Sequence, residues 1–288
     1  MPETMLGLTL PDVERLSDRV VVVRGLNPGP FTGPGTNTYL VGTERPILLD
    51  TGAGVKAYIG LLERALREHF QLDAPGDVVV THVHSDHLGG APDVLERFGP
   101  RPVSKRPWPG RDERVGVDIT PIGHRDTIRV IGATLRAIHT PGHAEDHLCF
   151  YLDEEKALFT GDVILGAGTT VIPLDGGDMG DYLETLERLL DLDLERIYPG
   201  HGPTILEPRR KVQEYLDHRL EREREILAAI EVGAVTVERM VERIYAAYPR
   251  KLHAAAGQSV TSHLHKLERE RRVVRRIDGG GEEHWSLV

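Results

Sequence analysis

The chain contains the stretch Thr81-His-Val-His-Ser-Asp-His-Leu-Gly-Gly90, directly after the apolar run 78–80. Imidazole nitrogens and carboxylate oxygens are the ligands that a borderline cation such as Zn²⁺ prefers. Three histidines and one aspartate stand too close together here to reach one tetrahedral ion. The spacing sends the first two side chains to one side and the last two to the other, which predicts two metal ions. These candidate ligands are His82, His84, Asp86 and His87.

Three further candidate ligands stand in glycine-containing motifs far along the chain. They are His143 in T-P-G-H, Asp162 in F-T-G-D and His201 in Y-P-G-H-G, and each follows a strand-like apolar stretch. Glycine beside a ligand lets the backbone turn sharply and approach an ion closely. A polar loop that is merely rich in histidine is the alternative, but four concordant motifs favour a metal site.

On these motifs the sequence resembles the metallo-β-lactamase superfamily, whose pattern is H-x-H-x-D-H followed by a distant His, Asp and His. The resemblance covers roughly Val20 to Leu206. It implies an αβ/βα sandwich with the ligands at loop ends along one edge. It also implies two metal sites, with His82, His84 and His143 at the first, Asp86, His87 and His201 at the second, and Asp162 bridging both.

Two other residues are candidates for orienting the ligands. Asp50 in I-L-L-D-T-G matches the first motif of the superfamily, which implies a carboxylate that orients ligands without binding metal. A turn cap after a buried strand is the alternative for Asp50. His147 could orient a ligand or donate to a leaving group, whereas a structural histidine is the alternative there. Cys149 lies in an apolar strand pattern, where a buried thiol is expected.

The composition is that of an ordinary globular protein. Of the 288 residues, 40% are hydrophobic and 28% are charged, and the formal net charge is −10. No apolar run approaches the roughly 18 residues that a membrane span requires. The first 17 residues show neither a secretory signal nor an Arg-rich transit peptide. We therefore expect a cytoplasmic protein with no membrane association.

The pattern of apolar residues predicts an α/β fold with two domains. Residues 1–206 are expected to form the catalytic domain, a four-layer αβ/βα sandwich. Amphipathic helices are predicted over Lys56–Phe70, Ala91–Phe98 and Met179–Leu190. Residues 207–288 are expected to form a linker helix and a small winged-helix domain.

Three helical segments and a terminal hairpin predict the winged helix. The helical segments are 209–231, 237–248 and 258–271, and the tail reads strand, glycine turn, strand. From Ile205 to the end there are 16 Lys and Arg against 14 Asp and Glu, a net of +2. This arrangement resembles the C-terminal domain of one branch of the superfamily, the β-lactamase-like endoribonucleases.

Two surfaces are candidates for contact with single-stranded RNA. The loop Ser104–Gly116 combines Lys105 and several arginines with an aromatic ring, which suits phosphates and an unpaired base. A solvated turn with its Trp packed on the core is the alternative. The second surface is the third helix of the winged helix, whose polar side chains would lie away from the apolar stripe Val260, Leu264 and Leu267. Those polar residues are Ser259, Thr261, Ser262, Lys266 and Arg269, and the candidate substrate contacts elsewhere are Arg106, Trp108, Arg111, Thr169 and Thr170.

Hydrolysis is the expected chemistry, because two ions about 3.5 to 4 Å apart can bridge a water and lower its pKa toward 7. Asp86 is the candidate catalytic residue, with a free oxygen that could orient the resulting hydroxide and pass its proton on. The leading hypothesis is an endoribonuclease with two zinc ions, manganese or iron being possible in their place. A glyoxalase-like thioester hydrolase is the alternative. A β-lactam hydrolase and a non-catalytic nucleic-acid-binding regulator are less favoured, and the oligomeric state is left open.

Overall fold

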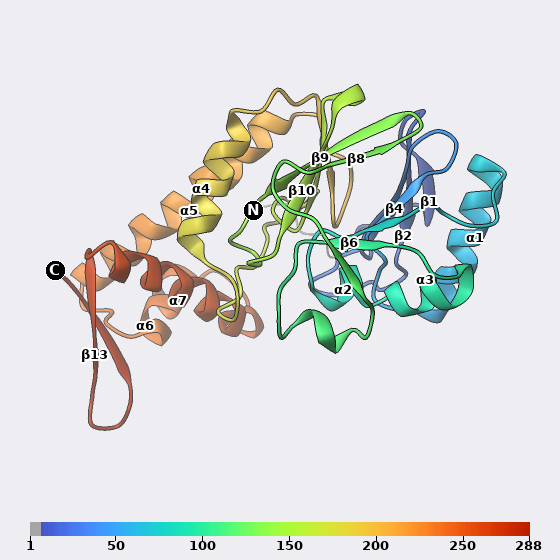
Figure 1. The fold of residues 1–288 in the computed structure, drawn as a ribbon. Coiled ribbons are helices and arrows are strands. Elements are labelled where there is room, and N and C mark those ends of the chain that lie inside the picture. Colours follow the sequence, from blue (N-terminus) through green and yellow to red (C-terminus); the bar gives the residue numbers. More distant parts are fainter. Residues whose placement is uncertain (1–6) are drawn as a thin grey trace. The chain divides into compact units, whose positions relative to one another are not determined.

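The computed structural model describes residues 7–288, and its residues cluster into two compact units. The first unit runs to Thr140 and resumes over Asp146–Thr170 and Leu192–Lys211, whereas the second comprises Pro141–Glu145, Val171–Asp191 and Val212–Val288. Figure 1 traces both units along the chain. The units interleave in sequence, so a domain boundary at residue 206 stays a prediction, and residues 1–6 of that domain lie outside the described residues.

The first unit is built on two β-sheets. The larger sheet is antiparallel over its first four strands and parallel from the fourth strand onward. In spatial order its strands are β1 (Val13–Arg15), β2 (Val20–Arg24), β3 (Asn37–Val41), β4 (Ile47–Leu49), β5 (Val78–Val79), β6 (Val103–Lys105) and β7 (Ile119–Pro121). The smaller sheet has the order β12 (Arg196–Pro199), β11 (Ala157–Gly161), β10 (Leu148–Leu152), β9 (Ala133–His139) and β8 (Thr127–Val130).

Both faces of the larger sheet are covered, which explains why β2 is an unbroken run of buried residues. Val20 and Val22 join a core that contains residues of both sheets, such as Phe159. Val21 and Val23 point to the opposite face and join a second core with the helices. Helices α1 (Lys56–Phe70) and α3 (Ala91–Phe98) supply that core, and both have the bounds that the sequence predicts.

The second unit contains the winged helix. Its elements are α4 (Met179–Leu190), most of α5 (Pro208–Glu231), α6 (Val237–Ile244), η3 (Arg250–Leu252), α7 (His253–Arg269) and the hairpin of β13 (Val273–Ile277) and β14 (Glu283–Leu287). Val260, Leu264 and Leu267 are buried against Trp285, as their spacing predicts. Helix α7 begins five residues before the predicted start at Gln258. The helix continues through Gly257 because α6 packs on it, with Val237 close to that glycine.

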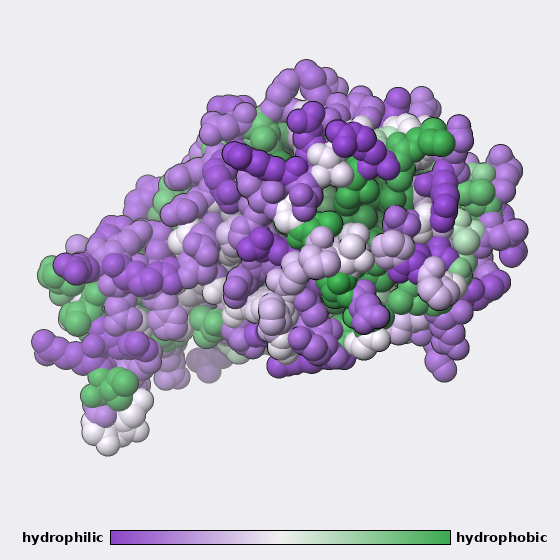
Figure 2. All heavy atoms as spheres, in the orientation of Figure 1, coloured by the Kyte–Doolittle hydropathy of each residue, from purple (hydrophilic) through white to green (hydrophobic). Residues whose placement is uncertain are grey.

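The visible surface in Figure 2 is largely hydrophilic, with scattered hydrophobic patches. Across residues 7–288 no helix is both long enough and apolar enough to cross a membrane.

Candidate metal centre

The histidine-rich stretch lies where the larger sheet ends and a short helix begins. Strand β5 ends at Val79 and α2 (Ser85–Leu88) begins five residues after Val80, so His82 and His84 lie in the connecting loop. Asp86 and His87 lie in the helix itself. The two pairs of side chains thus come from different elements, but they are not held apart, because the ring centres of His82 and His87 lie 4.3 Å from each other.

Four ligand atoms from three separate segments face one another at close range. His87 Nε2 lies 3.4 Å from Asp86 Oδ2 and 3.2 Å from Asp162 Oδ1. His201 Nε2 lies 3.2 Å from Asp86 Oδ2 and 3.3 Å from Asp162 Oδ1. Ligands about 2.0 to 2.1 Å from one tetrahedral ion are separated by roughly 3.3 Å. The spacing is therefore that of donor atoms around a single cation.

The buried nitrogen of His87 supports the same interpretation. His87 is fully buried, and within the described part of the chain its Nε2 makes no hydrogen bond of acceptable geometry. Leaving such an atom buried without a partner is costly. A cation between His87 and the two carboxylates would satisfy it, so the side chains present fit a metal ion.

Asp50 determines which ring nitrogen of two histidines carries a proton. Its Oδ2 lies 2.7 Å from His87 Nδ1, which must therefore donate, so a neutral His87 ring keeps its lone pair on Nε2. The Thr81 hydroxyl donates to the same carboxylate at 3.0 Å and lies 2.9 Å from His82 Nδ1. Because that hydroxyl has only one proton, His82 Nδ1 donates to it and His82 Nε2 keeps its lone pair. This arrangement supports the orienting role predicted for Asp50.

His82 and His84 bring a second pair of donor atoms together. His82 Nε2 lies 3.0 Å from His84 Nδ1, and the two rings meet edge to face. The ligand atoms of His82, His87 and Asp162 all lie within 4.8 Å of one another. Asp162 is therefore close both to the His82 side and to the His87 side of the cluster, which is the position that a bridging ligand needs.

Glycines let the loops that carry Asp162 and His201 approach closely. A Cβ atom on Gly200 would lie 2.7 Å from Asp162 Oδ1 and 2.8 Å from the Gly161 carbonyl oxygen. Gly161 has a φ of +44°, and a Cβ there would lie 2.6 Å from His147 Nε2. Any larger residue at either position would have to displace a neighbour in the cluster.

His147 contacts the backbone of a candidate ligand. The Asp162 N–H donates to His147 Nε2 at 3.2 Å, so the neutral ring is protonated at Nδ1 and donates to the Thr140 hydroxyl at 2.9 Å. The Thr140 N–H also donates to the His147 carbonyl oxygen. These bonds close the loop 140–147 at both ends.

His143 stands within this loop, in the segment 141–145 that clusters with the second unit. Its Nδ1 lies 2.7 Å from the Val171 carbonyl oxygen in the same unit, so that nitrogen donates and Nε2 keeps its lone pair. The ring is therefore prepared to offer one nitrogen to a cation. Its place in the first metal site stays a prediction.

The carboxylates of the cluster favour a positive charge beside them, as the pKa values of the histidines indicate. Although burial opposes the shift, the carboxylates of Asp86, Asp162 and Asp50 raise the pKa of His87 well above its usual value. Burial is likewise outweighed at His201, where Asp162 and Asp86 raise the pKa to about 9. The same contacts lower the pKa of Asp86 and Asp162 despite their burial. Without metal, protons on the histidines supply the positive charge that the carboxylates require.

Thr36 is a contact of the cluster that sequence reasoning did not identify. Its hydroxyl donates to Asp86 Oδ2 at 3.2 Å, and Asn27 fixes it by hydrogen bonds at 2.9 Å to its backbone and to its hydroxyl. Neighbouring Asn37 donates to the carbonyl oxygens of Pro199 and Gly202, on either side of His201. Residue type alone does not indicate these two contacts of the glycine-rich loop 27–37.

The predicted substrate contacts are partly occupied by contacts within the first unit. Trp108 is half-buried against the helix-side core, and the Arg111 guanidinium lies 4.6 Å from the centre of its ring. Arg106 is half-buried, Thr169 is half-buried and Thr170 is buried. Their contact with substrate stays a prediction. Lys105, expected to be available to phosphates, is instead buried between two carboxylates, so that expectation is wrong.

Most of the polar side chains of α7 that were expected to contact RNA are instead buried or bonded to other groups of the second unit. Ser262 is buried, and the Thr261 hydroxyl donates to the Gly257 carbonyl oxygen. Lys266 is paired with Glu223 at 2.7 Å and with Glu270 at 2.8 Å. Arg269 is paired with both carboxylate oxygens of Asp178. Carboxylates elsewhere in the second unit thus neutralise the cations that were expected to contact RNA.

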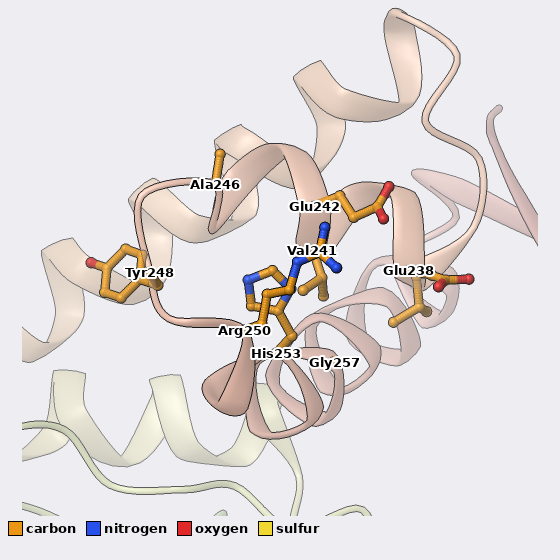
Figure 3. Close-up of a pocket in the computed structure, with 9 residues that line it drawn as sticks. Glu238, Val241, Glu242, Ala246, Tyr248, Arg250, His253 and Gly257 are labelled. Carbon is orange, nitrogen blue, oxygen red and sulfur yellow. The ribbon is translucent and has the colours of Figure 1, made fainter.

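A separate groove of about 780 Å³ opens in the second unit, beside α6 and the start of α7. Figure 3 shows Glu238 and Glu242 on one side, with Arg250 and His253 placed centrally. No predicted site residue lines this groove.

Comparison with known proteins agrees with this geometry. Residues 31–201 match the metallo-beta-lactamase superfamily, and residues 236–285 match the beta-lactamase associated winged helix domain. A Caenorhabditis elegans protein named beta-lactamase-like protein 2 homolog is 41% identical, over 88% of this chain and 86% of that protein. An Aspergillus chevalieri protein named atrochrysone carboxyl ACP thioesterase is 38% identical, over 97% of this chain and 90% of that protein.

Solved structures give the same result. A metallo-beta-lactamase family protein from Thermus thermophilus is 25% identical and covers 95% of this chain and 100% of its own, with a TM-score of 0.76. A protein solved in a di-iron-bound form is 29% identical, over 66% of this chain and 98% of its own, with a TM-score of 0.52. The buried His and Asp cluster fits the metal dependence of this group. The chain belongs to the metallo-beta-lactamase superfamily of hydrolases and carries the winged-helix domain associated with it.

Proposed function

We propose that the chain hydrolyses thioesters with a pair of divalent cations. The metal dependence of the proposed reaction rests on one observation: four ligand atoms of His87, His201, Asp86 and Asp162 meet at separations of 3.2 to 3.4 Å. Asp86, His87 and His201 would hold one cation. His82, His84 and His143 would hold the other, and Asp162 would bridge both.

The donor set restricts the metal. It consists of imidazole and carboxylate groups only, which suits zinc, manganese or iron. Cys149 is buried on β10, where Thr140 donates to its sulfur, so the thiol takes no part in the cluster. When bound, two such ions would lower the pKa of a water and polarise the carbonyl of the substrate. Elemental analysis of the purified chain would identify them.

Asp86, Thr36 and His147 would position the attacking water and the metal ligands and transfer the proton. Water oxygen forms a bond to the thioester carbon, and the carbon–sulfur bond breaks to give a carboxylic acid and a thiol. Asp86 would orient the water and take its proton, which then passes to the leaving sulfur. Thr36 would hold the Asp86 carboxylate in the required orientation through its hydrogen bond to Oδ2. His147 would fix the backbone of Asp162.

The thioester substrate rests on similarity and on the charges of the surface. The Aspergillus relative that spans nearly all of this chain has thioesterase in its name. Three of the basic groups that would favour RNA, namely Lys105, Lys266 and Arg269, each have a carboxylate partner. Cleavage of single-stranded RNA therefore has less support than cleavage of a thioester.

A parallel assay of three substrates tests the proposal. The purified chain would be supplied with zinc, manganese or ferrous iron and then offered an acyl-CoA thioester, unstructured single-stranded RNA and a chromogenic cephalosporin. We expect thiol release from the thioester, lost on chelation, and no more than background cleavage of the other two. Faster cleavage of RNA would restore the endoribonuclease hypothesis, whereas no metal-dependent cleavage of any substrate would favour a non-catalytic role.

A further inference from the structure

Lys105 is the centre of a buried cluster of charges in the first unit. Its ammonium lies 2.6 Å from Asp146 Oδ2 and 2.8 Å from Asp112 Oδ1, and it also donates to the Arg106 carbonyl oxygen at 2.6 Å. The side chains of Lys105 and Asp146 are fully inaccessible to solvent. Asp112 is also largely buried. One cation is thus shared by two carboxylates away from solvent.

The three charged residues belong to three different segments. Lys105 ends strand β6. Asp112 begins the helical turn η1 (Asp112–Arg114), and its Oδ2 accepts a hydrogen bond from the backbone N–H of Trp108 at 2.6 Å, which closes the turn 108–112. Asp146 lies in the loop 140–147, directly before His147. The ammonium therefore ties two loops to the end of the same strand.

Stability alone does not explain this cluster. Removing charges from water costs several kcal/mol per ion, and well-packed apolar side chains of similar volume are often at least as stabilising. A buried ion cluster does restrict geometry, because each ion tolerates few positions for its partner. Here the restricted segment includes His143, a proposed ligand, and His147, which holds the backbone of Asp162.

We infer that Lys105 is a positioning residue that fixes the metal-ligand loop 140–147 through Asp146. This inference rests on the proposed function, because it takes His143 and Asp162 as ligands. The ion pair between Lys105 and Asp112 has a different effect, because it orders the loop that contains Trp108. The two carboxylates therefore differ in effect. Loss of the ion pair between Lys105 and Asp146 weakens metal binding, whereas loss of the ion pair between Lys105 and Asp112 does not.

Two matched substitutions separate the two ion pairs. Asp146→Asn leaves Lys105 paired with Asp112, and Asp112→Asn leaves it paired with Asp146, so each variant keeps one balanced ion pair. Metal-free protein would be titrated with zinc against a chelating dye, and folding would be checked by circular dichroism. We expect Asp146→Asn to weaken binding of at least one ion by roughly 10- to 100-fold. Asp112→Asn should bind both ions as the parent chain does.

Further variants keep the test decisive. Asp146→Glu retains the charge on a longer side chain, and we expect an intermediate loss of metal affinity, so the inference can be tested even where Asp146→Asn does not fold. Lys156→Met removes an exposed lysine that pairs with Asp193 and should change nothing. Equal metal affinity in Asp146→Asn, Asp146→Glu and the parent chain would overturn the inference.

The two proposals fail in different ways. If the parent chain binds two ions but cleaves no thioester, the proposed substrate is wrong, yet the affinity difference between the two Asn variants remains. If the thioester is cleaved and both Asn variants bind metal normally, the substrate stands and the role of Lys105 is overturned.

Discussion

Buried histidines occur in both units of this chain, and their neighbours give them opposite protonation. In the His and Asp cluster of the candidate metal centre, the carboxylates of Asp162 and Asp86 outweigh burial and raise the pKa of His201 to about 9. In the second unit, His263 is equally buried, but burial and the charges of Arg219, Lys266 and Arg222 lower its pKa well below the usual value. Burial is common to both, so the sign of the neighbouring charge decides.

The His and Asp cluster and the region around His263 differ in whether their charges favour binding of a cation. In the His and Asp cluster, the carboxylates of Asp86 and Asp162 lie beside the Nε2 atoms of His87 and His201. The region around His263 already contains arginine and lysine side chains, and these in turn have carboxylate partners such as Glu223 and Glu225. In this chain, the histidine-rich region that fits a cation is therefore the one whose neighbouring charge is negative.

The largest expected effect follows from removing negative charge at the cluster. Asp162→Asn takes away the carboxylate that faces both His87 and His201. We expect the rate of thioester hydrolysis to fall on the order of 100- to 1000-fold, with loss of metal. Steady-state kinetics and elemental analysis would measure both. Asp118→Asn, at an exposed position, is the matched control. An unchanged metal content in Asp162→Asn would break the comparison.

A smaller effect is expected from Asp50, which acts through its neighbours. Asp50→Asn keeps the size of the side chain but weakens the hydrogen bond that fixes His87 and, through Thr81, His82. Loss of such an orienting group typically costs 10- to 100-fold in metal affinity. Competition with a chelating dye would measure it. A variant that binds metal as tightly as the parent chain would show that Asp50 is only a turn residue.

The two histidine environments predict opposite pH dependence in the metal-free protein. His201 has a raised pKa, so its contribution to stability is complete below pH 6.5 and is lost as pH rises through about 9. His218 in the second unit has its pKa lowered from 6.5 to about 4, first by burial and then by Arg219 and Arg222. Between pH 6.5 and 4, His218 is protonated in the unfolded chain but neutral in the folded chain. The free energy of unfolding therefore falls as pH drops through this range.

Urea unfolding across this pH range would test the contrast. Metal-free His201→Gln should have a smaller alkaline slope, because only His87 with its raised pKa remains, and an unchanged acid slope. His218→Gln should have a smaller acid slope, to which His263 still contributes, and an unchanged alkaline slope. The alkaline slope should also vanish in the parent chain once metal is bound. Identical pH profiles for both variants would mean that these histidines do not control stability.

The smallest effect is expected at the paired cations of α7. Arg269→Gln breaks an exposed ion pair with Asp178, and such pairs contribute about 0 to 1 kcal/mol. We expect no change in hydrolysis and no change in filter binding of single-stranded RNA. Salt-dependent RNA binding that weakens in this variant would show that the pair opens to receive phosphate.

The residues that the structure brings together in the His and Asp cluster were easier to identify from the sequence than the substrate surfaces. Residues such as His87 and Asp162 were identifiable because metal binding requires a few residue types, which glycines mark at loop positions. The helices at Lys56–Phe70 and Ala91–Phe98 were predictable because each has an apolar stripe facing the sheet. Family resemblance supplied the grouping of the ligands, which spacing alone leaves open.

The roles of the basic residues could not be predicted, because their partners are distant along the chain. Asp146 lies 41 residues beyond Lys105, Glu223 lies 43 residues before Lys266, and Asp178 lies 91 residues before Arg269. Composition shows that a segment is basic but not whether a carboxylate neutralises it. The hydrogen bond from Thr36 to Asp86 was hidden for the same reason, since 50 residues separate them.

We propose that the buried His and Asp cluster binds two divalent cations and that hydrolysis depends on them. Elemental analysis of the purified chain, with thioester hydrolysis followed before chelation, after chelation and after metal is returned, tests it most directly. We expect two equivalents of metal per chain, with activity lost on stripping and recovered on reloading. A metal-free chain that hydrolyses its substrate at the full rate would contradict it.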